Sequence, residues 1–207
     1  MMKELFDGIK RFNASDFIKH KDLFASIGKK QNPHTLFISC SDSRLVPTLI
    51  TKTLPGELFI IRNIANIVPF YRASDEFLST TSGIEYAILV LEIQNIVICG
   101  HSNCGGCKAF FEDESVLSRT PHTRKWLELA KNVKSKIESE NIADPAEKEW
   151  KTEQLNIVEQ MNNLMTYPFI NERYQNKTLS IFGWYYIIET GEVYNYDKTQ
   201  KEFIKIE

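Results

Sequence analysis

Thr35-Leu-Phe-Ile-Ser39, followed at once by Cys40, is the first of three short and unbroken apolar runs in this sequence. Leu58-Phe-Ile-Ile61 is the second, and Ile96-Val-Ile-Cys-Gly100 follows an expected helix from about residue 74 to 91. Continuous apolar runs that alternate with helices are typical of strands buried on both faces of a parallel sheet. The sequence therefore predicts an α/β fold with a central, mainly parallel sheet and flanking helices.

The C-terminal part of the chain predicts a different edge for this sheet. Leu179-Ser-Ile-Phe182 is predicted as a strand, Glu189-Thr-Gly-Glu192 favours a hairpin, and Phe203 to Ile206 is predicted as the last strand. These features indicate an antiparallel edge near the C-terminus. Before them, helices are predicted from Pro121 to about Glu138 and from Asp144-Pro-Ala-Glu147, which supplies an N-cap and a first-turn proline.

Residues 1–30 are predicted to form an N-terminal helical arm. Ser15 and Asp16 favour the start of a helix, an apolar stripe follows, and Gly28 favours its end. That stripe needs a surface to cover, either within its own domain or on a partner subunit. No linker or internal repeat divides the sequence, so residues 1–207 are expected to form a single domain.

The composition limits the classes of function. The chain has 43% hydrophobic and 25% charged residues, as an ordinary globular protein does. Its 25 basic and 27 acidic residues include no long basic run, so we expect no nucleic-acid partner. No apolar run is long enough to span a bilayer, and the N-terminus lacks the apolar segment of a secretory signal. We therefore expect a cytoplasmic protein with no membrane partner.

Potential metal ligands follow the first and third of the predicted strands. Cys40 comes directly after one run, and His101-Ser-Asn-Cys104 comes directly after the other. Ligands bind beyond the carboxyl ends of parallel strands, so both segments are expected at the same rim of the sheet. Two cysteine thiolates and one histidine form a set that zinc prefers. We therefore predict one zinc ion (Zn2+) per chain, held by Cys40, His101 and Cys104.

Three protein ligands leave the fourth coordination position of such a site undetermined. Water could fill it, which would make the site catalytic, or Asp42 in Cys40-Ser-Asp42-Ser-Arg44 could bind the metal directly. Arg44 could instead hold that carboxylate in a bidentate pair and leave the position to water. A further alternative is that Asp42 and Arg44 are ordinary residues of a surface turn.

Other interpretations of the cysteines are a redox pair or a structural zinc site with four cysteines, because Cys104-Gly-Gly-Cys107 is a Cys-x-x-Cys sequence. No second such pair exists in the sequence, and either interpretation leaves His101 without a role. Cys99 and Cys107 are therefore expected to be small core residues. Gly105 starts a predicted helix, whose free N–H groups favour a thiolate or a bound anion at the metal.

At these residues the sequence resembles the β-class carbonic anhydrases. That family carries a Cys-x-Asp-x-Arg motif, here Cys40-Ser-Asp42-Ser-Arg44, and a His-x-x-Cys motif, here His101-Ser-Asn-Cys104. The resemblance extends from about residue 20 to the end of the chain. Further similar segments are Gln31-Asn-Pro, Pro55-Gly-Glu-Leu-Phe59, Arg62-Asn-Ile-Ala-Asn66, Gly83-Ile-Glu-Tyr86-Ala, Asn156-Ile-Val-Glu-Gln160 and Gly183-Trp-Tyr-Tyr186.

The resemblance implies reversible hydration of carbon dioxide to bicarbonate and a proton, by attack of zinc-bound hydroxide. It also implies that Asp42 and Arg44 form a gating dyad and that Asp42 binds zinc in a closed state. The positions expected to bind substrate are Gln31, Phe59, Tyr86 and Gly105, with Gln31 donating a hydrogen bond to bicarbonate. In this family the lining residues come partly from a second subunit, which implies a homodimer, often paired into a dimer of dimers (a homotetramer). A partner subunit would also give the arm of residues 1–30 its surface.

Two other functions fit the same fold. Carbon disulfide and carbonyl sulfide hydrolases share its zinc ligands, although Gln31, Phe59 and Tyr86 together favour carbon dioxide. A non-catalytic protein that binds zinc or bicarbonate is expected to have a broken ligand set or dyad, and both are complete here. Regulation by bicarbonate stays open, because Phe37 stands where regulated members carry tryptophan, whereas Arg62 and Tyr186 match other residues of their regulatory pocket.

Overall fold

The computed structural model describes residues 1–73 and 78–207. Within these residues six strands form one sheet in the order β2-β1-β3-β4-β5-β6. The pairs among β2, β1, β3 and β4 are parallel, whereas β5 and β6 add as antiparallel strands. The strands are β1 Thr35–Cys40, β2 Leu58–Asn63, β3 Asn95–His101, β4 Ser180–Tyr186, β5 Val193–Asp197 and β6 Glu202–Lys205. The predicted parallel sheet with an antiparallel C-terminal edge is confirmed.

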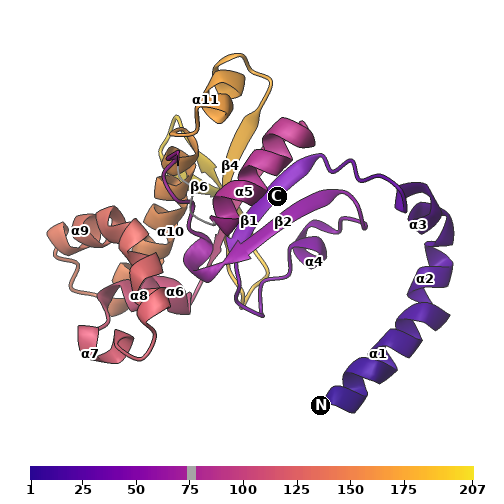
Figure 1. The fold of residues 1–207 in the computed structure, drawn as a ribbon. Coiled ribbons are helices and arrows are strands. Elements are labelled where there is room, and N and C mark those ends of the chain that lie inside the picture. The colour runs from indigo at the N-terminus through magenta and orange to yellow at the C-terminus, as the bar shows by residue number, and fades with distance from the viewer. Residues whose placement is uncertain (74–77) are drawn as a thin grey trace.

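Helices cover both faces of the parallel part of this sheet, as Figure 1 shows. The α-helices are α1 Met2–Ala14, α2 Asp16–Lys19, α3 Lys21–Ile27, α4 Pro47–Thr51, α5 Ser79–Glu85, α6 Gly105–Lys108, α7 Glu114–Leu117, α8 Pro121–Leu127, α9 Lys131–Ser139, α10 Pro145–Leu164 and α11 Pro168–Gln175. The short turns are η1 Ile64–Asn66, η2 Tyr86–Val90, η3 Ala109–Phe111 and η4 Glu128–Ala130.

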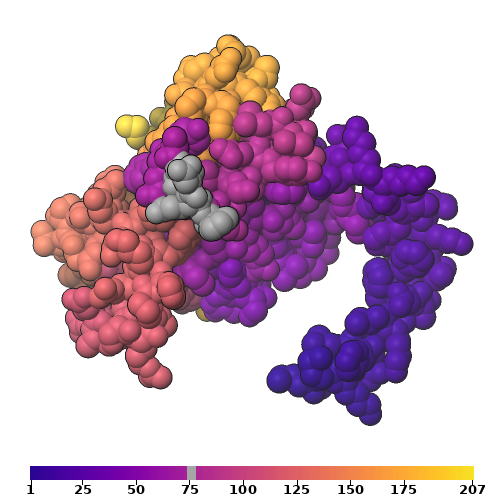
Figure 2. Space-filling view, viewed as in Figure 1, coloured from indigo at the N-terminus to yellow at the C-terminus, as the bar shows by residue number. Residues whose placement is uncertain are grey.

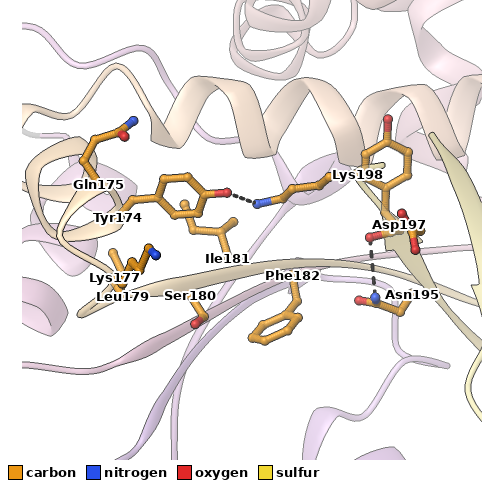
Figure 3. Close-up of a pocket in the computed structure, with 11 residues that line it drawn as sticks. Tyr174, Gln175, Lys177, Leu179, Ser180, Ile181, Phe182, Asn195, Asp197 and Lys198 are labelled. Atoms are coloured by element: carbon orange, nitrogen blue, oxygen red, sulfur yellow. Dashed lines mark hydrogen bonds between the residues drawn. The ribbon is translucent and has the colours of Figure 1, made fainter. Parts of the chain in front are cut away.

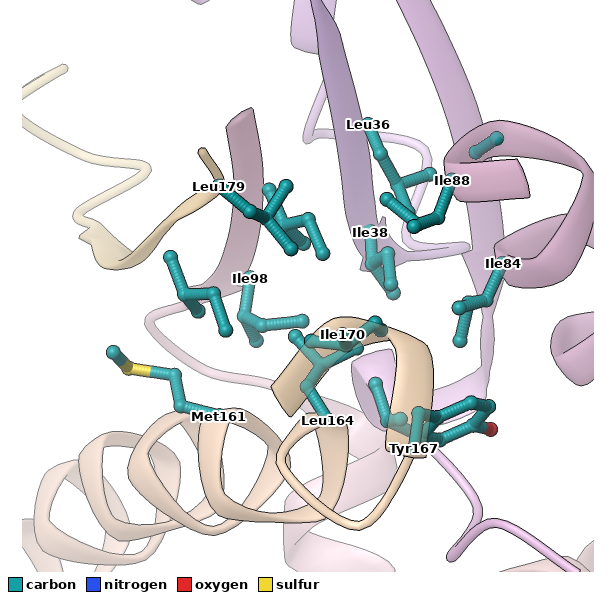
Figure 4. Close-up of a cluster of buried hydrophobic side chains, with 14 of the residues drawn as sticks. Leu36, Ile38, Ile84, Ile88, Ile98, Met161, Leu164, Tyr167, Ile170 and Leu179 are labelled. Carbon is teal, nitrogen blue, oxygen red and sulfur yellow. The ribbon is translucent and has the colours of Figure 1, made fainter. Parts of the chain in front are cut away.

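Alternate residues of the central strands face opposite layers, as the period of a strand requires. Leu36 and Ile38 of β1 point toward α10 and join a buried cluster with Met161 and Leu164 (Figure 4). Phe37, between them in the sequence, belongs to a separate cluster on the other face. The first strand is therefore buried on both sides, as its unbroken apolar run predicts.

The long helix α10 begins where the sequence predicts and approaches the sheet closely. Asp144 caps it by accepting a hydrogen bond from the N–H of Ala146 at 2.8 Å. A side chain at Gly183 of β4 would bring its Cβ within 2.5 Å of the sulfur of Met161. Glycine is therefore required where helix and strand come into contact.

Other boundaries differ from the sequence prediction. The helix expected from about residue 121 to 138 is divided, because the short turn η4 separates α8 from α9. The helix expected from residue 74 begins at Ser79 in the described chain, and residues 74–77 lie outside the described residues. It ends in a π-helical turn, in which the N–H of Leu91 donates to the carbonyl of Tyr86 at 3.0 Å. A π turn is rare and often occurs near functional sites.

The predicted N-terminal arm consists of α1, α2 and α3. Its first two helices stand clear of the rest of the chain (Figure 2), whereas Ile27 at the end of α3 lies beside Gly56. The rings of Phe12, Phe17 and Phe24 contact one another within it. The apolar side chains Leu5, Phe6 and Ile9 are more than half exposed. The arm therefore leaves an apolar stripe without cover inside this chain.

Across the described helices, none combines the length and the apolar character that crossing a membrane requires.

Candidate metal centre

The order of the strands brings the predicted ligands together. Cys40 is the last residue of β1 and His101 is the last residue of β3. These strands pair in parallel with Ser39 opposite Cys99, so both ligands leave the same rim of the sheet. Cys104 lies three residues beyond β3, at the start of α6. All three side chains are buried.

The donor atoms of these three residues fit a single zinc ion. The sulfurs of Cys40 and Cys104 are 3.9 Å apart, close to the separation of about 3.8 Å that two Zn–S bonds of about 2.3 Å give in a tetrahedral site. All three donor atoms lie within 4.8 Å of one another. Among the described residues this is the one group of three or more such side chains close enough to share an ion.

The histidine presents the correct nitrogen to this centre. Nδ1 of His101 lies 2.9 Å from the carbonyl oxygen of Ser102. A carbonyl can only accept, so Nδ1 carries a proton, and in the neutral imidazole Nε2 then keeps a free lone pair. Nε2 is buried and has no hydrogen-bond partner among the described residues. A buried acceptor without a partner is costly, and a metal ion at this position would satisfy it.

The thiols also need a cation. A hydrogen bond with Cys104 and burial raise the pKa of the Cys40 thiol to about 12. A hydrogen bond with Cys107 and burial likewise raise the pKa of Cys104. Thiolates are therefore unstable here unless a positive charge compensates them, and a divalent ion would cancel both.

The predicted pair of Asp42 and Arg44 is formed beside the ligands. Oδ1 of Asp42 accepts from the backbone N–H and from Nε of Arg44, each at 2.9 Å, and Oδ2 accepts from Nη2 at 2.7 Å. These bonds hold the pKa of Asp42 well below its usual range. Oδ2 also lies 3.9 Å from Nε2 of His101. The carboxylate is thus ionised, held by the guanidinium and adjacent to the metal position.

A second arginine braces the loop that carries this pair. Nε of Arg62 donates to the carbonyl of Cys40 at 3.0 Å, and Nη2 donates to the carbonyls of Asp42 and Leu45 at 2.6 and 2.8 Å. The guanidinium therefore fixes the backbone from the first ligand through the dyad.

Sequence reasoning missed one buried carboxylate at this centre. Glu153 of α10 accepts a hydrogen bond from the N–H of Cys104 at 2.7 Å and another from the hydroxyl of Tyr185 at 2.7 Å. Burial raises the pKa of Glu153 to about 7. The signal in the sequence is an acidic residue on the buried stripe of α10, which also carries Asn156 and Ile157.

The residues expected to bind substrate lie in two places. Phe59 and Tyr86 stack with ring centroids 6.0 Å apart. Phe59 pairs with Leu36, four residues before Cys40, so it lies roughly 13 Å from the ligand along the strand. Gln31 precedes β1 at the same far end, whereas Gly105 is at the metal centre in the first turn of α6. One chain therefore does not bring Gln31, Phe59 and Tyr86 to its own metal ligands.

The alternatives for the cysteines are not supported. All four cysteines of the chain are described, buried and free, so Cys104 and Cys107 form no disulfide. The sulfur of Cys107 points to the side-chain amide of Asn156, at 3.7 Å, and belongs to a core cluster. Cys99 is fully buried in another cluster. Both are core residues, as the sequence predicts.

The cavity in Figure 3 is separate from this centre. It has a volume of about 610 Å³ and is lined by α11, the start of β4 and β5. Ser180 in its wall pairs with Asn95, at the opposite end of β3 from His101. Two of the lining residues contact each other, because Lys198 donates to the hydroxyl of Tyr174 at 2.9 Å. No predicted site residue lines it among the described residues.

Comparisons with known proteins agree with this centre. The family model described as carbonic anhydrase matches residues 35–193. A carbonic anhydrase of Helicobacter pylori strain J99 is 44% identical over 99% of this chain and 94% of its own length. A carbonic anhydrase of Pseudomonas aeruginosa is 35% identical over 99% of this chain and 92% of its own.

Solved structures agree with the fold as well. The β-carbonic anhydrase CcaA superposes with a TM-score of 0.94 at 36% identity and covers 99% of both chains. A structure from a study of two tetrameric β-carbonic anhydrases of Sordaria macrospora has a TM-score of 0.81 at 30% identity, covering 94% of this chain and 95% of the other.

Proposed function

This chain belongs to the β-class carbonic anhydrase family, and we propose that Asp42 and Arg44 govern its zinc centre while a second subunit completes its substrate pocket. It catalyses the reversible hydration of carbon dioxide to bicarbonate and a proton, and Cys40, His101 and Cys104 hold its zinc. When bound, zinc supplies Lewis-acid chemistry that makes water a nucleophile near neutral pH.

Asp42 acts as a hydrogen-bond acceptor that orients the attacking water. The observation that carries this role is the position of Oδ2, 3.9 Å from Nε2 of His101, while Arg44 holds both carboxylate oxygens. A carboxylate with a fixed orientation and a low pKa accepts a hydrogen bond from the water without taking up its proton. Release of this carboxylate by Arg44 would let Asp42 occupy the fourth ligand position and close the site.

The partner subunit supplies the remaining walls of the pocket. Phe59 and Tyr86 form an apolar surface suited to carbon dioxide, and Gln31 lies exposed before β1 as a hydrogen-bond donor for bicarbonate. Their distance from the metal ligands of their own chain favours a site shared between two subunits. Gly105, exposed at the start of α6, contributes its backbone N–H from the metal side.

The active assembly is a homodimer, which can pair into a dimer of dimers. A two-fold dimer places the lining residues of each chain in the site of the other, so both sites are completed together. The arm of residues 1–30 packs its apolar stripe on the partner subunit, and residues 1–207 form one domain. The tetrameric relative from Sordaria macrospora is compatible with this assembly.

A reducing compartment, the cytoplasm, suits this protein. Its four cysteines are free, and oxidation of Cys40 or Cys104 would remove a zinc ligand.

Mixed dimers test the shared pocket. One chain carries Cys104→Ala, which removes a zinc ligand, and the other carries Gln31→Ala, which removes a lining residue. If the lining comes from the partner, each mixed dimer contains one site with intact ligands and an intact glutamine. Random exchange makes half of the dimers mixed, so hydration should recover to about a quarter of the wild-type rate. The rate is measured by stopped flow with a pH indicator.

The control mixes Cys104→Ala with His101→Ala, because no exchange of these chains gives a complete ligand set. It should stay inactive. A mixture of the Cys104→Ala and Gln31→Ala chains that shows no more than the activity of Gln31→Ala alone would show that the lining belongs to the same chain as the ligands.

A further inference from the structure

The peptide group between Asn103 and Cys104 is held on both of its polar sides. Nη2 of Arg44 donates to its carbonyl oxygen, on Asn103, at 3.0 Å. Its N–H, on Cys104, donates to Oε1 of Glu153 at 2.7 Å. These two contacts fix the plane of the peptide that leads directly into the metal ligand.

The backbone at this point needs such support. The backbone of Asn103 has φ +55°, in the left-handed region that residues other than glycine rarely adopt. A residue in this region persists only where surrounding contacts hold it. The direction of the Cys104 side chain follows from this turn, so the contacts that hold the peptide also determine where its sulfur lies.

Glu153 is itself fixed in the core. Glu153 is only 2% exposed. Its Oε2 accepts a hydrogen bond from the hydroxyl of Tyr185, which is also buried. An ionisable side chain in the core destabilises a fold unless its hydrogen bonds compensate. The other buried polar side chains of α10, such as Thr152 and Asn156, carry no charge. A carboxylate at this position is thus explained by its contact with the ligand loop rather than by packing.

We infer that Glu153 is a positioning residue for the zinc ligand Cys104 and that Tyr185 holds Glu153 in place for this role. The inference rests on the proposed function in one respect, because Arg44 of the dyad holds the other side of the same peptide. A continuous series of hydrogen bonds then runs from Asp42 through Arg44 and the peptide to Glu153 and Tyr185. Groups that orient a metal ligand typically contribute about 10–100-fold to metal affinity.

Two substitutions at position 153 separate hydrogen bonding from packing. Glu153→Met keeps the approximate size and removes the acceptor, whereas Glu153→Gln keeps a carbonyl oxygen that can accept from the N–H of Cys104. The dissociation constant for Zn2+ is measured by competition with a chelator. We expect Glu153→Met to raise it about 10–100-fold, and we expect Glu153→Gln to restore most of the affinity.

The cobalt form gives a second reading that does not depend on activity. The thiolate-to-metal charge-transfer absorption of Co2+ reports how the cysteine sulfurs bind. We expect this band to weaken or shift in Glu153→Met and to stay near that of the wild type in Glu153→Gln. A change that affected only the stability of the fold would leave the band of the folded, loaded protein unaltered.

Tyr185→Phe tests the outer contact, and Tyr196→Phe is its matched control. Both rings pack against Phe203, with centroids 6.2 and 5.2 Å away, so each substitution removes one hydroxyl beside the same ring. Only Tyr185 donates to Glu153 at 2.7 Å. Tyr185→Phe should weaken zinc binding, by less than Glu153→Met does, and Tyr196→Phe should leave it unchanged.

Several results would overturn the inference. Wild-type zinc affinity and an unchanged cobalt band in Glu153→Met would do so, as would equal losses in Glu153→Gln and Glu153→Met. If Glu153→Met does not fold, unchanged zinc affinity in Tyr185→Phe decides against it, because this substitution removes the hydroxyl that holds Glu153. Failure of the mixed dimers described above leaves these metal affinities untouched, so the two proposals can fail separately.

Discussion

Arg44 connects the two segments that carry the zinc ligands. Its Nη2 donates both to Oδ2 of Asp42, on the loop after Cys40, and to the carbonyl of Asn103, on the loop before Cys104. Exposed ion pairs contribute little to stability, and the Arg44 side chain is half-exposed. The geometry of this pair therefore matters more for the orientation of Asp42 than for the stability of the fold.

Arg44→Met should slow hydration while the protein keeps its zinc. Without the guanidinium, Asp42 loses its bidentate partner and is free to take the fourth ligand position. We expect a loss of about 10–100-fold in kcat/KM, measured by stopped flow, with one zinc per chain by elemental analysis.

Asp42→Asn should also retain zinc and lose activity, because an amide accepts a hydrogen bond less well than a carboxylate.

Arg119→Met removes an exposed arginine between α7 and α8 and serves as the control. An Arg44→Met protein with full zinc and an unchanged rate would mean that the pair only braces the loop.

The residues of the centre differ in how far sequence could predict them. Cys40, His101 and Cys104 follow predictable strands, and parallel pairing places the ends of adjacent strands side by side. Glu153 comes from a helix about 50 residues beyond the last ligand, and no fixed spacing connects the two. Its role depends on how α10 packs, which the order of residues alone does not give. Only its acidic character on a buried stripe could have indicated it.

At the scale of elements, α10 lies against the sheet through glycines. A Cβ on Gly100 of β3 would lie 2.7 Å from Ile157, and a Cβ on Gly183 of β4 would lie 2.9 Å from the same side chain and 2.5 Å from the sulfur of Met161. This close approach also brings Glu153 of α10 within hydrogen-bond distance of Cys104. The glycines therefore determine the distance between the helix and the metal centre.

Gly183→Ala should destabilise the protein because the added methyl group has no room. Overpacking a core usually costs about 1–3 kcal/mol, and we expect a decrease of that size in the free energy of unfolding, measured in urea. Gly8→Ala is the control, since a Cβ there would come no closer than 3.9 Å to the side chain of Arg11. It should leave stability equal or slightly higher, because alanine favours a helix over glycine. Equal effects of the two substitutions would contradict the close packing.

Element types were more predictable than element ends. Runs of apolar residues predicted β1 and β3 because both strands are buried on both faces and carry few polar side chains. The apolar run of β2 predicted a strand as well, although β2 is only partly buried. The π turn after α5 was not predictable, because a contact distant in sequence supports it: Arg173 of α11 donates to the carbonyl of Ile88 at 3.1 Å. The same turn carries Tyr86, so the position of this proposed pocket residue depends on α11 as well.

At the scale of the whole molecule, an apolar surface surrounds the exposed edge strand β2. Its large side chains are between 38 and 61% exposed, and they are Val46, Leu49, Leu54, Ile60, Ile64, Tyr86, Leu89 and Val90. Patches of this kind usually mark an interface in a protein that is otherwise well packed. The patch includes Tyr86 and adjoins Phe59, so a partner bound here would lie against the proposed pocket residues.

Leu49→Glu should therefore separate the subunits and reduce hydration together. Leu49 is 61% exposed on α4, so the single chain tolerates a charge there, whereas a buried interface would not. We expect dimer formation to weaken by about 2 kcal/mol or more, as for a central interface residue, measured by sedimentation equilibrium. Zinc content should stay at one per chain because Leu49 is exposed, whereas Cys40, His101 and Cys104 are buried within the chain.

Val116→Glu is the matched control, since Val116 is 54% exposed on α7, outside the patch. It should leave both assembly and rate unchanged. If Leu49→Glu gives a monomer that hydrates carbon dioxide at the wild-type rate, then one chain contains a complete site, and Phe59 and Tyr86 do not act on a partner. If activity instead returns at high protein concentration, in parallel with the dimer, then assembly limits the reaction and the two subunits share each pocket.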